Sequence, residues 1–224
     1  MPSARRIVIA SGNRHKVAEL QRAISAVPAA GGIKVLCASD QGELPTIIED
    51  RQTFAGNATV KALGFANWLR ERGEEGAALV LADDSGLCVD ALGQAPGIRS
   101  ARFAGEHAGD VDNNRALVEA LRALGLEASP AHYVCALAIA RVDGQPLPGS
   151  NREGVCIFTG QWHGEVRVTP RGSGGFGYDP YMWIDNGRRT VAELTPEQKS
   201  SRSHRGAAAI GLQAALPTIL APTS

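Results

Sequence analysis

Two adjacent aspartates follow directly on an apolar run near the middle of this 224-residue chain. The run, from Ala77 to Ala82, is short and continuously apolar, which is typical of a strand buried on both faces of a sheet. Because a buried strand cannot easily hold two charges, we expect Asp83 and Asp84 to emerge at its carboxyl end, where Gly86 would turn the chain. In open α/β sheets, ligands bind at this end of the strands.

Neighbouring carboxylates repel each other, and a bound divalent cation would relieve that repulsion. The alternative is an Asx-type turn without a chemical role, and these residues alone do not decide between the two. Other segments of the chain therefore have to show whether the carboxylates bind a metal or only shape a turn.

The apolar pattern alternates between strand and helix along most of the chain. Strands are predicted over residues 6–10, 34–38, 77–83, 133–142 and 154–158. Helices are predicted from about His15 to Val27, from the N-cap Thr53 to about Arg72, from Asp112 to Leu124, and from Thr195 toward Leu216 with an interruption near Ser203. This order predicts a mixed α/β domain in which the last two strands form an antiparallel pair.

Charge and cysteine content argue against several classes of protein. Lys plus Arg and Asp plus Glu both number 23, so the chain has no net charge with which to hold a nucleic-acid backbone. The four cysteines form no CxxC pair, which is typical of buried, reduced thiols. No apolar run approaches the roughly 18 residues of a membrane span. We therefore expect a cytoplasmic protein that binds neither nucleic acid nor a membrane.

A further candidate segment joins the first strand to the first helix. It consists of Ser11, Gly12, Asn13, Arg14, His15 and Lys16. Backbone N–H groups at a helix N-terminus attract anions, and the lysine adds a full positive charge. The spacing of a Walker loop is missing, and taken alone the segment is better explained by an ordinary capped helix with a solvated lysine.

Acidic residues precede the second helix. Glu49 and Asp50 are either hard oxygen ligands for magnesium or simple complements of the helix dipole. On the carboxyl-terminal side of the chain, Lys199 and the pair His204-Arg205 could donate to a purine carbonyl or a phosphate. Taken alone, these basic residues are better explained as solvated charges on a helix face.

The loop from Gly172 to Pro180 has four glycines within six residues, which is a high entropic cost for a plain connection. Phe176 or Tyr178 could stack on a nucleotide base, and Asp179 could accept a hydrogen bond from a base N–H. The alternative is a surface loop whose aromatic rings pack into the core. The density of glycine favours a functional loop.

The motifs form an ordered set from Ser11 to about Ala209. The set comprises Ser11-Gly12-Asn13 with Lys16, Thr53-Phe54 with Asn57-Ala58 and Lys61-Ala62, Asp83-Asp84-Ser85-Gly86-Leu87, Pro96-Gly97 with Ser100-Ala101-Arg102, Gly174 to Pro180, and Glu193-Leu194 with Lys199 and Ser203-His204-Arg205. Each motif alone is weak, whereas all of them in this order are specific. In this order they resemble the inosine triphosphate pyrophosphatase family, which hydrolyses non-standard purine nucleoside triphosphates.

The resemblance implies hydrolysis of a nucleoside triphosphate to the monophosphate and pyrophosphate, with ITP, XTP and their deoxy forms preferred. It implies Mg²⁺ as cofactor and a homodimer. It also implies one domain over residues 1–224, in which an elongated mixed sheet flanked by helices carries two lobes with the active site between them.

The resemblance also assigns roles to individual residues. Ser11 to Lys16 would hold phosphates, Glu49 and Asp84 would hold magnesium, and Asp84 would be the general base. Ser85 would touch the substrate. The base would be read by Phe176, Gly177, Tyr178, Asp179, Lys199, His204 and Arg205. A cationic donor facing the 6-oxo group would favour hypoxanthine over adenine by about 1–3 kcal/mol.

One position departs from the family pattern, because Gly56 stands where many members carry a glutamate. Loss of a capping-box partner for Thr53 would cost about 0.5–1 kcal/mol of helix stability. Loss of a metal ligand would instead weaken magnesium binding. Two other functions stay open: a related pyrophosphatase for modified pyrimidine or methylated nucleotides, and a nucleotide-binding module without catalysis.

Overall fold

The computed structural model describes residues 6–25, 33–74 and 78–221. Val27 and Ala77, the expected ends of a helix and a strand, lie outside these residues. The chain divides into two compact units. Unit 1 contains residues up to Asp84, Ala136–Thr159 and the chain from Ala207, and unit 2 contains Ser85–Cys135 and Gly160–Gly206.

Seven strands form one sheet in the order β2-β1-β3-β4-β5-β6-β7. The strands are β1 (Arg6–Ala10), β2 (Lys34–Cys37), β3 (Ala78–Val89), β4 (Ala128–Arg141), β5 (Cys156–Arg167), β6 (Met182–Ile184) and β7 (Arg189–Thr190). Strand β1 pairs in parallel with β2 and β3, whereas β6 pairs antiparallel with β5 and β7. The predicted mixed α/β fold is confirmed, and β4 and β5 are longer than predicted.

In the described part of the chain, five α-helices accompany the sheet. They are α1 (Arg14–Ser25), α2 (Phe54–Glu71), α3 (Asp110–Ala123), α4 (Pro196–Arg202) and α5 (His204–Ile219). Short 3₁₀ turns cover Ala38–Gln41, Asp90–Leu92, Gly97–Arg102 and Val191–Glu193. The predicted interruption between α4 and α5 is confirmed at Ser203, which has extended backbone angles. No helix in the described part of the chain is long and apolar enough to cross a membrane.

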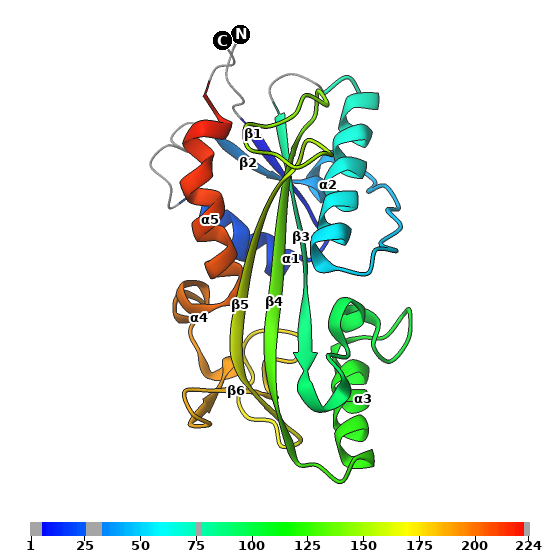
Figure 1. Cartoon of the computed structure of the whole chain (residues 1–224), viewed down its shortest axis with the longest axis vertical. Coiled ribbons are helices and arrows are strands. Elements are labelled where there is room, and N and C mark those ends of the chain that lie inside the picture. Colours follow the sequence, from blue (N-terminus) through cyan, green and yellow to red (C-terminus); the bar gives the residue numbers. More distant parts are fainter. Residues whose placement is uncertain (1–5, 26–32, 75–77, 222–224) are drawn as a thin grey trace. The chain divides into compact units, whose positions relative to one another are not determined.

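Within unit 1, helices cover both faces of the strands. Figure 1 shows α2 on one side of these strands and α5 on the other. Val8 and Val80 pack with the buried face of α2. Their neighbours Ile7 and Leu79 point to the opposite face and are also fully buried. The core of unit 2 is separate and joins α3 to β4, β5 and β6.

Two helix N-termini have the predicted caps. The Thr195 hydroxyl accepts from the Gln198 N–H, with Pro196 in the first helical position. The Thr53 hydroxyl accepts from the Gly56 N–H at 3.0 Å, so this cap forms without a glutamate at position 56. A Cβ at Gly56 would lie 2.8 Å from the Cβ of Arg51, so a larger residue would need the chain before α2 to shift. The four cysteines are buried free thiols, as predicted.

The expected end of β3 at Asp83 is wrong. The strand continues without interruption from Ala78 to Val89, through both aspartates and through Gly86. Asp83 is 2% exposed and Asp84 is 7% exposed. The burial of Asp83 is tolerated because Lys16 compensates its negative charge. Lys16 Nζ lies 2.6 Å from Asp83 Oδ1.

Candidate functional site

Unit 1 holds a cluster of five charged side chains, Lys16, Glu49, Lys61, Asp83 and Asp84, which we call the unit 1 cluster. Besides its contact with Asp83, the cluster contains an ion pair of 2.8 Å between Lys61 Nζ and Glu49 Oε2. Lys61 Nζ also donates to the backbone carbonyl of Asp83 at 3.1 Å. The two lysines thus connect α1 and α2 to the middle of β3, and Lys61 also fixes the segment that carries Glu49.

The first turn of α1 places Lys16 in this cluster. Asn13 Oδ1 accepts from the backbone N–H groups of His15 and Lys16 at 3.0 and 3.1 Å, so Asn13 is the N-cap. The Ser11 hydroxyl in turn accepts from the Asn13 N–H. Arg14 and His15 are exposed. Of the segment predicted to hold phosphates, Lys16 therefore provides the charge inside the cluster, and Ser11 and Asn13 shape the turn before it.

Burial raises the pKa of Asp84 from 3.8 to about 6. Lys61 and Lys16 lower this pKa, while Glu49 and Asp83 raise it. The cluster holds three carboxylates and two ammonium groups, so it has one excess negative charge when every group is ionised. A proton or a cation at Asp84 would remove that excess.

Glu49 and Asp84 are the residues of the cluster that could hold a metal. Their carboxylate oxygens suit Mg²⁺, which usually takes one or two protein carboxylates and completes its shell with water and phosphate. Among residues 6–25, 33–74 and 78–221, no group of three or more His, Cys, Asp and Glu side chains could hold a metal ion. Two carboxylates such as Glu49 and Asp84 are a donor set that suits an ion bound together with phosphate.

Unit 2 holds a second group of polar side chains, centred on Asp179. Asp179 Oδ1 accepts from the Tyr133 hydroxyl at 3.1 Å. Asp179 Oδ2 accepts from Lys199 Nζ at 2.7 Å and from the Phe176 backbone N–H at 2.9 Å. We call these four residues, with His204 and Arg205, the unit 2 cluster.

The remaining members of the unit 2 cluster lie at the start of α5. The His204 ring stacks on Tyr133 with 4.8 Å between centroids. Arg205 donates to the Ser85 hydroxyl at 2.6 Å. Lys199 Nζ lies 4.2 Å from the Phe176 ring centroid, and the Arg205 guanidinium lies 5.4 Å from it. Lys199, His204 and Arg205 are buried, so their interpretation as solvated charges on a helix face is wrong.

The glycine-rich loop is held by α3 and by its own tyrosine. Asp110 Oδ2 accepts from the Gly177 N–H at 2.7 Å, and Asn114 Nδ2 donates to the Gly177 carbonyl at 3.0 Å. The Tyr178 hydroxyl donates to the backbone carbonyl of Ser100 at 2.8 Å, and its ring lies in the core of unit 2. Tyr178 thus anchors the loop, whereas Phe176 lies among the charged side chains.

Sequence reasoning assigned no role to several residues of these clusters. Lys61 and Asp83 belong to the recognised motifs, but they were not selected as site residues. Tyr133, Asp110 and Asn114 were missed because their partners are far away in the sequence. A buried tyrosine in a strand or an aspartate at a helix start looks structural until the fold brings its partner close.

We predict that Asp110→Ala loosens the loop at Gly177. Loss of one hydrogen bond of about 1 kcal/mol should speed exchange of the Gly177 amide about fivefold. Asp110→Asn keeps an oxygen acceptor and should exchange at nearly the wild-type rate. Hydrogen exchange followed by NMR measures both variants, and equal exchange in Asp110→Ala and the wild type would exclude the contact.

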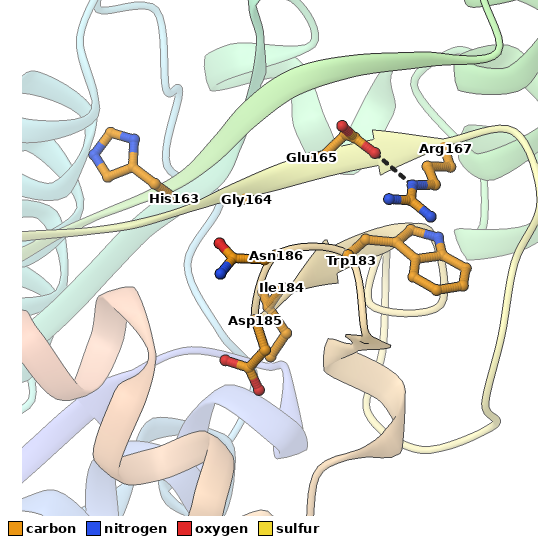
Figure 2. Close-up of a pocket in the computed structure, with 9 residues that line it drawn as sticks. His163, Gly164, Glu165, Arg167, Trp183, Ile184, Asp185 and Asn186 are labelled. Atoms are coloured by element: carbon orange, nitrogen blue, oxygen red, sulfur yellow. Dashed lines mark hydrogen bonds and ion pairs between the residues drawn. The ribbon is translucent and has the colours of Figure 1, made fainter.

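A pocket of about 590 Å³ lies elsewhere in unit 2, between β5 and the β6–β7 hairpin (Figure 2). Its charged lining is already paired within the protein, as Glu165 with Arg167 and Asp185 with Arg189 and Arg202. The predicted site residues do not line this pocket. We therefore treat each cluster as a candidate site within its own unit, and not this pocket.

Comparisons with known proteins agree on one family. The model of the Ham1 family matches residues 7–215. A dITP/XTP pyrophosphatase of Acinetobacter baumannii is 41% identical over 207 residues, which cover 90% of each chain. A relative of the same name from Geobacillus kaustophilus is 39% identical over 202 residues. The solved structure of a HAM1 protein from Coxiella burnetii is similar with a TM-score of 0.77 and 36% identity, covering 94% of this chain and 98% of that one.

Proposed function

The chain belongs to the Ham1 family, and from that premise we propose that it hydrolyses ITP, XTP and their deoxy forms to the monophosphate and pyrophosphate. These matches confirm the family that the ordered motifs predicted. The observation that carries the proposed activity is the unit 1 cluster. In it, a buried aspartate of raised pKa lies with two further carboxylates and two lysines, groups that can accept a proton, hold a metal ion and bind phosphate oxygens.

We propose that the unit 1 cluster acts on the phosphates. Lys16 and Lys61 bind phosphate oxygens, and Glu49 and Asp84 would hold Mg²⁺. A bound magnesium ion would neutralise charge on the phosphates of the substrate. Asp84 accepts a proton from the attacking water, whose oxygen bonds to the α-phosphorus. The bond between the α-phosphorus and the bridging oxygen breaks, and pyrophosphate leaves with that oxygen. The products are the monophosphate and pyrophosphate.

We propose that the unit 2 cluster selects the base. Lys199 and Arg205 donate to the 6-oxo group of hypoxanthine or xanthine, and Phe176 provides an aromatic surface. Adenine has an amino group at this position, so a buried donor would be left unpaired, at a cost of about 1–3 kcal/mol. The same donors would accept the oxo group of guanine, so its rejection requires a further contact.

We also propose that the protein works as a homodimer in the cytoplasm. The family resemblance supports the dimer. The buried free cysteines, which are typical of a reducing compartment, support the location.

Pyrophosphate release from a panel of nucleotides tests the proposed function. We expect rapid release from dITP and XTP with magnesium, slow release from dATP and dGTP, and loss of release when EDTA removes the metal. Comparable rates with a modified dUTP or dTTP would support the alternative of a pyrimidine-directed pyrophosphatase. Binding of ITP without pyrophosphate release would support a catalytically silent module.

A further inference from the structure

We propose that Asp179 acts on base selection through Lys199, as the buried counter-ion that fixes the lysine ammonium, and makes no contact with the base. The sequence suggested the opposite, that Asp179 accepts a hydrogen bond from a base N–H. The inference rests on the proposed function, because it concerns how that site distinguishes oxo from amino purines.

The Asp179 carboxylate is buried, and both of its oxygens already accept hydrogen bonds from the protein. The residue is 3% exposed. The Tyr133 hydroxyl donates to Oδ1, and Lys199 Nζ and the Phe176 N–H donate to Oδ2. Gly175 packs against Oδ2, so closely that a Cβ at this position would overlap the carboxylate. The carboxylate is therefore already engaged with Tyr133, Lys199 and the Phe176 backbone.

Lys199 is the member of this pair that can act on a ligand. It extends from α4, is 6% exposed, and lies 4.2 Å from the Phe176 ring centroid. An ammonium has three protons, and the bond to Asp179 uses one of them. Because the carboxylate compensates its charge, the lysine can offer an N–H to a neutral base without leaving an isolated charge buried.

The geometry around the pair explains why Asp179 determines the position of Lys199. A lysine has four rotatable bonds, so an ammonium without a partner would occupy many positions. Hydrogen bonds from Tyr133 and from the Phe176 backbone fix Asp179. Asp179 in turn fixes the Lys199 ammonium through a hydrogen bond of 2.7 Å. Asp179 is therefore a positioning residue for the donor to the 6-oxo group.

A double-mutant cycle tests the inference. We measure kcat/KM for dITP in Asp179→Asn, in Lys199→Met and in the double variant. We expect Lys199→Met to lower kcat/KM about 30-fold and Asp179→Asn about tenfold. The double variant should be no worse than Lys199→Met, since Asp179 has no role once the lysine is gone. Multiplication of the two losses, to about 300-fold, would show an independent contact of Asp179 and overturn the inference.

Thermal unfolding of the same variants gives a readout that needs no activity. Lys199→Met leaves a buried carboxylate uncompensated and should lower Tm by about 10 °C, and adding Asp179→Asn should recover most of that loss. No recovery in the double variant would contradict the counter-ion role. Asp143→Asn is the matched control: it removes an exposed carboxylate that pairs with Arg141, and it should leave kcat/KM unchanged.

Two further experiments test the inference if a variant does not fold or if the wild type is inactive. If Lys199→Met does not fold, Asp179→Asn alone is assayed on 1-methylinosine triphosphate, which keeps the 6-oxo group but has no N1–H. Action through Lys199 predicts the same loss of about tenfold as with dITP, whereas direct contact with N1–H predicts no loss. If the wild type does not cleave dITP, the proposed function fails, and the unfolding cycle still tests the counter-ion.

Discussion

Asp84→Asn should lower the turnover of dITP by about a thousandfold while the protein stays folded. The substitution keeps the shape of the side chain, but it removes the proton acceptor and a negative metal ligand. Steady-state pyrophosphate release measures the loss, and circular dichroism confirms the fold. Turnover at the wild-type rate in the folded variant would exclude Asp84 as the base.

The same substitution should stabilise the metal-free protein at high pH. The pKa of Asp84 rises from 3.8 to about 6 on folding, so its contribution to stability is fully present below pH 3.8 and is lost as the pH rises through 6. Above this range the buried charge costs on the order of 3 kcal/mol, and asparagine does not carry it. Urea unfolding in EDTA should show Asp84→Asn more stable than the wild type at pH 8, with a much smaller gain at pH 5. A gain independent of pH would contradict the assignment.

Lys16→Met should damage both stability and activity. Asp83 is buried and loses its ion-pair partner at 2.6 Å, so unfolding free energy should fall by about 3 kcal/mol. The lost phosphate contact should also lower kcat/KM for dITP about 100-fold. Urea unfolding and initial rates measure the two effects.

A second substitution separates these two effects. Adding Asp83→Asn to Lys16→Met should restore most of the stability, since no charge is left uncompensated, but it should not restore activity. Lys34→Met serves as the control, because Lys34 is an exposed lysine of the same unit. Full recovery of activity in the double variant would show that Lys16 only neutralises Asp83.

Much of the fold could be predicted because local signals agree with the observed elements. The strand β1 has the predicted bounds, Thr53 and Thr195 cap the predicted helices, and the interruption at Ser203 is where the pattern changes. The course of β3 was not predictable in this way. Its continuation through Asp83 and Asp84 depends on Lys16 and Lys61, which come from other elements and are brought close only by the fold.

Residues could be selected from the sequence where they belong to a recognisable motif. They were missed where their role depends on a partner from another element of the fold. The charged residues Asp84 and Lys199 were selected because they belong to motifs whose order resembles the inosine triphosphate pyrophosphatase family. Asp179 was found, but the sequence suggested contact with a base, because its partners Tyr133 and Lys199 lie in other elements. The sequence shows that a polar side chain is present, whereas only the fold shows which neighbouring groups form hydrogen bonds with it.

Phosphorus NMR of dITP incubated with the protein and magnesium is the most direct measurement of the proposed reaction. Cleavage between the α- and β-phosphates predicts dIMP and pyrophosphate in equal amounts, with no orthophosphate. A dITP spectrum that stays unchanged with folded protein, or the appearance of dIDP with orthophosphate, would contradict it.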